Sequence, residues 1–189
     1  MTREELVTLL DESPVVAAVK DDPGLQRCLF SECRVAFILY GDICTVPAII
    51  SALKKTGKVV FVHIDLIDGL SAREVAVDFI AENTHADGII STRPALIRHA
   101  REQGLFTVQR FFLLDSIALQ NVQRQMESGS ADLIEILPGV MPKIIRRLAG
   151  SSGKPLIAGG LISDKEDILQ ALGAGAIAIS STNEGVWFM

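Results

Sequence analysis

Two turns near the end of the sequence combine glycines, hydroxyls and an amide in a pattern that suits phosphate binding. Gly159-Gly160 follows the short apolar run 155–158, and residues 180–183 follow the apolar run 176–179. If these runs are neighbouring parallel strands, both turns lie at one edge of the sheet and present free backbone N–H groups to an anion. The alternative is that the turns are only tight connections. The predicted phosphate-binding residues are Gly159, Gly160, Ser181, Thr182 and Asn183.

Charged and polar side chains mark the ends of several other apolar runs, where a barrel of alternating strands and helices has its binding site. Glu135 lies inside such a run, so its carboxylate needs a partner such as Lys20 or Arg110. The carboxylate either forms a buried ion pair that holds the barrel together or accepts a hydrogen bond from a ligand hydroxyl. Asp65 has the same two interpretations. The predicted ligand-binding residues are Lys20, Asp65, Gln109, Arg110 and Glu135.

His63 precedes Asp65 by two residues, so both side chains could point into the same interior. No further metal ligands can be placed beside them, and we interpret His63 as a histidine of the core or one linked to solvent. We predict neither a metal site nor a cofactor. Carboxylates and a lysine around a phosphate are also what an isomerase, aldolase or decarboxylase would use. Because no clear acid and base pair can be named, we predict no catalytic residues, and an enzyme acting on a small sugar phosphate is the alternative.

The composition favours one parallel sheet covered by helices. Of the 189 residues, 49% are hydrophobic and only 5% aromatic, and the apolar residues form short runs of Ile, Leu, Val and Ala. Cys28, Cys33 and Cys44 match neither zinc nor thioredoxin spacing, which indicates a reducing compartment. No apolar run is long enough to span a bilayer, and the acidic N-terminus does not resemble a signal peptide. We therefore expect a cytoplasmic protein without a membrane partner.

Eight apolar runs read as strands, with helical segments between them. Right-handed crossovers in this order close a TIM-type (β/α)8-like barrel as a single domain over residues 1–189. Residues 1–12 are predicted to form an N-terminal helix that could cap the barrel floor. Too few residues follow Asn183 for a full C-terminal helix, so an open doubly wound sheet is the alternative. The predicted strands are 15–19, 35–40, 58–64, 87–90, 106–110, 132–136, 155–158 and 176–179.

The last predicted helix lies between the two phosphate turns. Ser163-Asp164 has the residue types of a helix start, and Glu166 is placed to complete a capping box there. The helix is expected to end at Gly173-Ala174-Gly175, because glycine readily adopts the left-handed backbone that ends many helices.

Several longer segments resemble the glycerol-3-phosphate-responsive antiterminator family of bacterial glycerol operons. They are DGIISTR at 87–93, GLFTVQR at 104–110, EILPGVMP at 135–142, AGGLI at 158–162, and SSTNE at 180–184 with Trp187. The resemblance extends from about Pro14 to the end of the chain. It implies a regulator that senses glycerol 3-phosphate and lets transcription pass a terminator in the leader mRNA of glycerol-uptake genes. Under this reading the phosphate rests on the two turns, while Lys20, Arg110 and Glu135 face the glycerol.

RNA binding requires local positive charge, because the chain has a net charge of −5. Lys143, Arg146 and Arg147 have the i, i+3, i+4 spacing of one helical face, and Arg98 with Arg101 forms a second group. Such groups can also be ordinary solvated helix faces, and aromatic residues that could stack on bases are few. A sensor that acts through a protein partner is therefore a third hypothesis. The protein could also self-associate, and residues 184–189 could become ordered over the barrel mouth when ligand binds.

Overall fold

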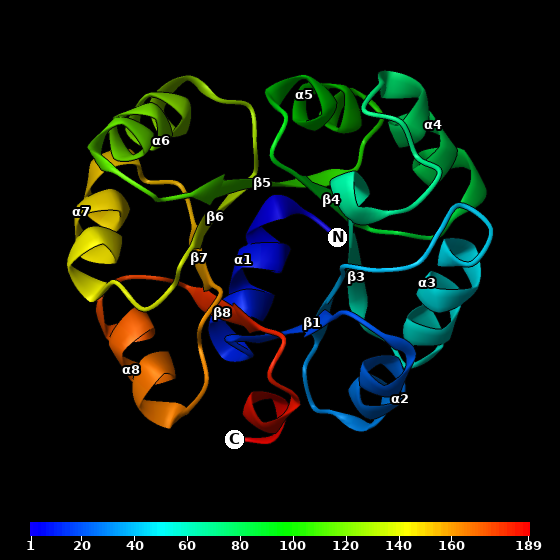
Figure 1. The fold of residues 1–189 in the computed structure, drawn as a ribbon, viewed down its shortest axis with the longest axis horizontal. Helices are drawn as coiled ribbons and strands as arrows, with labels where there is room; N and C mark the ends of the chain where they lie inside the picture. Colours follow the sequence, from blue (N-terminus) through cyan, green and yellow to red (C-terminus); the bar gives the residue numbers. More distant parts are fainter.

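The computed structural model is a closed barrel of eight parallel strands surrounded by helices (Figure 1). The strands pair in chain order and β8 closes the barrel against β1, so the predicted (β/α)8-like barrel is confirmed and the open-sheet alternative is wrong. The structure describes the backbone of all 189 residues and every side chain except those of Ser128 and Ser152. The strands are β1 Val15–Val19, β2 Val35–Ile38, β3 Val59–His63, β4 Gly88–Ser91, β5 Phe106–Phe112, β6 Leu133–Leu137, β7 Leu156–Gly159 and β8 Ala178–Ser181.

Most of the helices begin where the sequence supplies a side-chain cap or a proline. Asp21, Asp115 and Asp164 each accept a backbone N–H bond at the start of a helix. The capping role predicted for Glu166 is wrong, because Asp167 is the residue whose carboxylate reaches back, to the N–H and hydroxyl of Ser163. The helices are α1 Arg3–Glu12, α2 Asp22–Phe30, α3 Val46–Lys55, α4 Glu74–Asn83, α5 Pro94–Glu102, α6 Ser116–Ser128, α7 Pro142–Ser152 and α8 Lys165–Gly173, with short 3-10 segments η1 Ile64–Leu66 and η2 Glu184–Phe188.

Alternate residues of each strand fill the barrel interior, and the N-terminal helix closes one end of it. The inner cluster contains Phe37 and Phe61, whose rings meet edge to face with centroids 5.6 Å apart. Leu6 and Leu10 of α1 are fully buried in the same cluster. In Figure 1 α1 accordingly lies inside the ring of strands. The barrel therefore has a closed floor, and its polar groups can be reached only from the carboxyl ends of the strands.

The C-terminal segment lies on the wall of the barrel. Figure 1 shows η2 between α8 and α2, and β8 is followed by this short turn instead of a full α-helix, as predicted. Trp187 is buried there, and its indole N–H donates to the Ser181 carbonyl oxygen at 2.8 Å. Arg27 of α2 forms a 2.7 Å ion pair with Glu184. This segment therefore packs against the wall of the barrel and does not cover the mouth, and its movement over the mouth on ligand binding stays a prediction.

The helices of the described chain are short or interrupted by charged residues, and none of them could cross a membrane.

Candidate functional site

The inward-facing positions of four strands change from apolar to polar near the carboxyl ends of the strands. Each polar residue comes two positions after an apolar residue of the inner cluster, because successive side chains of a strand alternate between its two faces. All four polar residues are at most 7% exposed. They are His63 on β3, Arg110 on β5, Glu135 on β6 and Ser180 on β8. The apolar core of the barrel is therefore covered by a polar layer just below the mouth.

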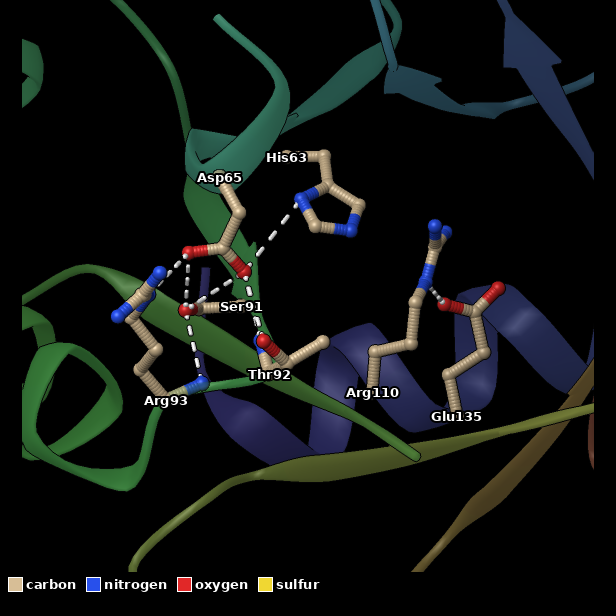
Figure 2. Close-up of polar contacts among 7 residues, drawn as sticks. All are labelled: His63, Asp65, Ser91, Thr92, Arg93, Arg110 and Glu135. Carbon is tan, nitrogen blue, oxygen red and sulfur yellow. Dashed lines mark hydrogen bonds and ion pairs between the residues drawn. The ribbon is translucent and has the colours of Figure 1, made fainter. Parts of the chain in front are cut away.

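Arg110 and Glu135 form a buried ion pair within this layer. The two residues are direct neighbours in the β5–β6 register, and Arg110 Nε donates to Glu135 Oε2 at 2.6 Å (Figure 2). The hydroxyl of Ser180 donates to the other carboxylate oxygen, Oε1, at 2.5 Å. Arg110 is thus the partner that Glu135 requires. Lys20, the other predicted partner, is exposed just beyond the end of β1, and the described hydrogen bonds of Glu135 come from Arg110 and Ser180 instead.

A cavity of about 360 Å³ opens above this pair and contains most of the predicted phosphate-binding residues. Its lining includes Gly160, Ser181, Thr182 and Asn183 from the loops after β7 and β8. Arg110 and Glu135 form part of the same lining. The structure therefore brings together the two groups of residues that the sequence predicted separately, the phosphate turns and the ion pair.

Gly159 lies at the point where the β7 backbone passes closest to the ion pair. A Cβ atom at this position would lie 2.6 Å from both Glu135 Oε1 and Ser180 Oγ. These distances are shorter than an ordinary van der Waals contact. Only glycine therefore fits at this position unless the side chains of Glu135 and Ser180 move. Gly159 thus contributes close backbone approach and not a side-chain contact.

The loop after β7 has an unusual backbone. Gly160 has a φ of 74° and the next residue, Leu161, has a φ of 62°, a region that residues with a side chain rarely adopt. The loop is tied to its neighbour by Ser181 Oγ, which donates to the Ile162 carbonyl oxygen at 2.7 Å, and by Asn183 Nδ2, which donates to the Ser163 carbonyl oxygen at 3.1 Å. Ser181 and Asn183 therefore brace the loop, while the Thr182 hydroxyl has no partner among the described residues.

The loop after β6 packs against this same segment. The Gly139 N–H donates to the Gly160 carbonyl oxygen at 3.0 Å. A Cβ at Gly139 would meet the backbone of Ala158 and Gly159 at 2.9 Å, so the two loops are in direct contact without intervening side chains. The segment that leads into α7 is therefore in contact with one side of the cavity.

Asp65 lies on η1, at the mouth side of β3, with its carboxylate fully engaged by protein groups. It accepts from the Ser91 hydroxyl at 3.0 Å and from the Thr92 N–H at 2.8 Å, and Arg93 Nε lies 3.4 Å away (Figure 2). These contacts join the end of β3 to the loop after β4. Of the two interpretations of Asp65, the geometry favours the stabilising one.

His63 is buried between Asp65 and Arg110 without a hydrogen bond at its ring Nδ1. Nδ1 lies 3.8 Å from Asp65 Oδ2, which is too long for a hydrogen bond. Burial lowers the pKa of His63 to about 4, helped by the Arg110 charge and only partly opposed by Asp65. The imidazole is therefore neutral at physiological pH. The sequence placed His63 near Asp65 but gave no signal that its ring would be left without a partner.

Gln109 does not lie at the mouth, contrary to the prediction. Because Arg110 takes the inward position on β5, the preceding side chain points to the outer face of the strand. There it lines a small cavity with Arg98 and Gln125, on the opposite side of the strand from the ion pair. The prediction failed because two adjacent strand residues cannot both face the barrel interior.

The predicted RNA-binding cations are exposed but form two separate groups. Lys143, Arg146 and Arg147 lie on α7, whereas Arg98 and Arg101 lie on α5. Figure 1 shows α6 between these two helices, so the groups are not one continuous patch. Among the described residues, no group of three or more His, Cys, Asp or Glu side chains is arranged to hold a metal ion.

The fold and this site define a (β/α)8 barrel with a cavity at the carboxyl ends of its strands, lined by the buried ion pair and by the loops after β7 and β8. The chain belongs to the glycerol-3-phosphate responsive antiterminator family, whose model matches residues 15–187. The resemblance identified in the sequence is thereby confirmed. The chain is also 46% identical over 182 residues to the uncharacterized protein YgcP of Escherichia coli strain K12, and the match covers 96% of this chain and 95% of that protein.

Two similar solved structures have names related to the same process. The glycerol uptake operon antiterminator regulatory protein of Listeria monocytogenes is 30% identical with a TM-score of 0.87, over 92% of this chain and 94% of that one. A glycerol uptake operon antiterminator-related protein of Thermotoga maritima is 33% identical with a TM-score of 0.81, over 94% of this chain and 99% of that one. A deoxyribose phosphate aldolase from Aeropyrum pernix, at 17% identity and a TM-score of 0.69, shares the fold alone.

Proposed function

We propose that this protein binds glycerol 3-phosphate in the cavity above Arg110 and Glu135 and, in response, promotes antitermination at the leader mRNA of glycerol-uptake genes. Membership of the glycerol-3-phosphate responsive antiterminator family supports the regulatory role. The observation that supports the ligand site is the position of Arg110. Its guanidinium is only 7% exposed, lines the cavity and uses Nε alone for Glu135. Both Nη groups are thus available to an anionic ligand.

The cavity offers complementary groups for both ends of such a ligand. A phosphate binds well to a guanidinium and to backbone N–H groups in glycine-rich turns, because charge-assisted hydrogen bonds are stronger than neutral ones. The loops after β7 and β8 supply those turns, with Gly160 and Thr182 facing the cavity. The ligand is an effector in this proposal, and no cofactor takes part.

We propose a regulator and not an enzyme because the cavity lacks groups poised for proton transfer or covalent catalysis. Its described lining contains no lysine, so no Schiff base can form there. Both oxygens of Glu135 already accept hydrogen bonds, from Arg110 and Ser180. Glu135 is the one carboxylate in the described lining, and its two hydrogen bonds support a stabilising role for it in preference to a catalytic one.

We expect glycerol 3-phosphate to raise the thermal unfolding midpoint, and glycerol or inorganic phosphate alone to raise it much less. Binding to the folded state alone stabilises it by about 2.7 kcal/mol at a hundredfold excess over Kd. The midpoint is measured by scanning fluorimetry or calorimetry over a concentration series of each compound. The absence of a shift with glycerol 3-phosphate, or a larger shift with another sugar phosphate, would contradict the ligand assignment.

We expect the α7 cations to bind RNA, with the ligand bound. In Lys143→Gln/Arg146→Gln/Arg147→Gln, leader RNA affinity should fall and the slope of log affinity against log salt should decrease by about 2, since each lost phosphate contact to single-stranded RNA removes about 0.7. Ligand binding should be unchanged. RNA affinity is measured by filter binding at several salt concentrations, in parallel with terminator read-through in a purified transcription assay.

A variant with the same charge change elsewhere serves as control for this experiment. Lys55→Gln/Arg73→Gln/Lys165→Gln removes three exposed cations outside α5 and α7. Its RNA affinity should stay near that of the wild type. If the α7 variant keeps full RNA affinity while Arg98→Gln/Arg101→Gln loses it, the RNA interface lies on α5 and not on α7. If the ligand-bound wild type binds no leader RNA, the sensor that acts through a protein partner becomes the better hypothesis.

A further inference from the structure

Every backbone carbonyl oxygen of the turn 129–132, which leads from α6 into β6, accepts a hydrogen bond from a cationic side chain. The three cations, which we call the floor cluster, are Arg3 of α1, Arg101 of α5 and Lys154 from the loop after α7. Arg3 Nη2 donates to the carbonyl oxygen of residue 132 at 3.0 Å, Arg101 Nη1 donates to that of residue 130 at 2.7 Å, and Lys154 Nζ donates to those of residues 129 and 131. Figure 1 shows α6 between α5 and α7, so cations from both sides of α6 meet at this turn.

The floor cluster carries more positive charge than the turn requires. A neutral N–H or O–H donor also satisfies a carbonyl oxygen, so the charges are not needed for these bonds. Burial lowers the pKa of Lys154, and the nearby charges of Arg3 and Arg101 lower it further. The Asp132 carboxylate partly opposes this effect, but it is buried and accepts from the N–H and hydroxyl of Thr107. Positive charge is therefore in excess around this turn, which favours the binding of an anion.

The two arginines of the cluster have donors left for such an anion. Both residues are exposed, and each uses one guanidinium nitrogen for the turn. The other guanidinium nitrogens of Arg3 and Arg101 have no hydrogen-bond partner among the described residues. A guanidinium matches the oxygens of a phosphate group, and one that is already fixed at a single nitrogen loses less freedom when it binds.

Arg98 adds a fourth cation beside the same turn. It precedes Arg101 by three residues on α5, so the two side chains are neighbours on the helix surface. Arg98 is exposed, and in the part of the chain that the structure describes it forms no ion pair or side-chain hydrogen bond. Together with Gly129 and Ser130 it lines a cavity of about 210 Å³. The positive surface therefore extends from the turn along α5.

We propose that the floor cluster and Arg98 bind the phosphodiester backbone of the leader RNA, as a contact region additional to the α7 cations. This inference rests on the proposed function and names a second part of its RNA surface. The turn precedes β6, so it lies at the closed end of the barrel, opposite the ligand cavity. Phosphate contacts contribute affinity but carry no sequence information. The floor cluster therefore strengthens the binding of any RNA sequence, and its contribution does not depend on ligand.

The test removes the charges and keeps amide donors for the carbonyl oxygens, in Arg3→Gln/Arg101→Gln/Lys154→Gln. RNA affinity is measured by filter binding at several salt concentrations, for leader RNA and for a scrambled RNA of equal length, with and without glycerol 3-phosphate. We expect affinity to fall at least about tenfold, by the same factor for both RNAs and in both ligand states. The slope of log affinity against log salt should decrease by about 2, since each lost contact to single-stranded RNA removes about 0.7.

Two further variants separate charge from folding. Lys55→Gln/Arg73→Gln/Lys165→Gln removes three exposed cations elsewhere and should leave affinity and slope near those of the wild type. Arg98→Gln breaks no described side-chain contact within the protein, so it serves if the triple floor variant does not fold. Its slope should decrease by about 0.7, with the urea unfolding midpoint unchanged.

The outcomes distinguish a failure of this inference from a failure of the proposed function. Unchanged affinity and slope in the floor variant and in Arg98→Gln, while the wild type binds RNA, would overturn the floor site alone. A loss confined to leader RNA would also overturn it, because backbone contacts do not read sequence. Loss of inorganic phosphate binding, followed by phosphorus NMR, with RNA affinity retained would mean that the cluster holds a free anion instead. A wild type that binds no RNA would contradict the proposed function itself.

Discussion

Replacing Arg110 alone is expected to destabilise the protein far more than replacing Arg110 and Glu135 together. In Arg110→Met the fully buried Glu135 carboxylate keeps only the Ser180 hydroxyl as a partner. An uncompensated buried charge costs about 3–5 kcal/mol of the free energy of unfolding. In Arg110→Met/Glu135→Gln both charges are removed, and the amide oxygen can still accept from Ser180. We therefore expect the double variant to lie within about 1–2 kcal/mol of the wild type.

Urea unfolding of the wild type, the two single variants and the double variant gives the coupling energy between the two residues. The exposed pair Arg34–Glu12 is the matched control, since its side chains are 51% and 63% exposed and its disruption should cost at most about 1 kcal/mol. Additive losses in the double variant would mean that the buried pair does not act as a unit. The double variant should also fail to bind ligand while remaining folded, which separates the stabilising role of the pair from its binding role.

Gly159→Ala is expected to abolish ligand binding at ordinary concentrations, with at least a hundredfold loss of affinity, or about 2.7 kcal/mol. The added methyl group would approach Glu135 Oε1 and Ser180 Oγ to 2.6 Å, so the carboxylate and the strand must separate. Overpacking of this kind costs about 1–3 kcal/mol of stability, so the variant should still fold at moderate temperature. Titration calorimetry measures the affinity, and circular dichroism checks that the barrel is retained.

Gly150→Ala is the control for the added methyl group. Gly150 lies in α7, and a methyl group there would meet no described neighbouring side chain within 4 Å, so the position has space for alanine. Alanine within a helix should raise stability by up to about 1 kcal/mol, with no effect on ligand affinity. Near wild-type affinity in Gly159→Ala would show that the close approach of β7 to the ion pair is not needed for binding.

The fold could be predicted from the sequence because buried parallel strands are short apolar runs. Each run can be identified without knowing which strand pairs with it. Every predicted strand is present, with its ends shifted by no more than two residues. The positions of the two turns that are predicted to bind phosphate followed directly, because they are fixed once the ends of β7 and β8 are known. The cost of burying a charge predicted that Glu135 has a cationic partner such as Lys20 or Arg110, and the β5–β6 register selects Arg110.

The remaining site features depend on which face of a strand a residue occupies and on what its neighbours already bind. Gln109 was predicted to face the ligand because the sequence locates the end of β5 but does not show which of the adjacent residues Gln109 and Arg110 points inward. Lys20 follows the last residue of β1 and is exposed, although charge alone made it a suitable partner for Glu135. The unpaired ring of His63 depends on Asp65 being occupied by Ser91 and Thr92, which are distant in sequence.

The contact between Gly139 and Gly160 links the cavity to the surface of α7, so ligand binding can change the conformation of that helix. In the sequence, Gly139 stands between Glu135, which lines the cavity, and Lys143, which is exposed on α7. A stretch of nine residues, 135–143, thus connects the cavity to the exposed face of α7. A ligand that displaces Gly160 must also displace Gly139, because no side chain lies between them to absorb the movement. We therefore expect the first turn of α7 to be the part of the surface most sensitive to ligand, which amide hydrogen exchange at residues 140–146 would detect.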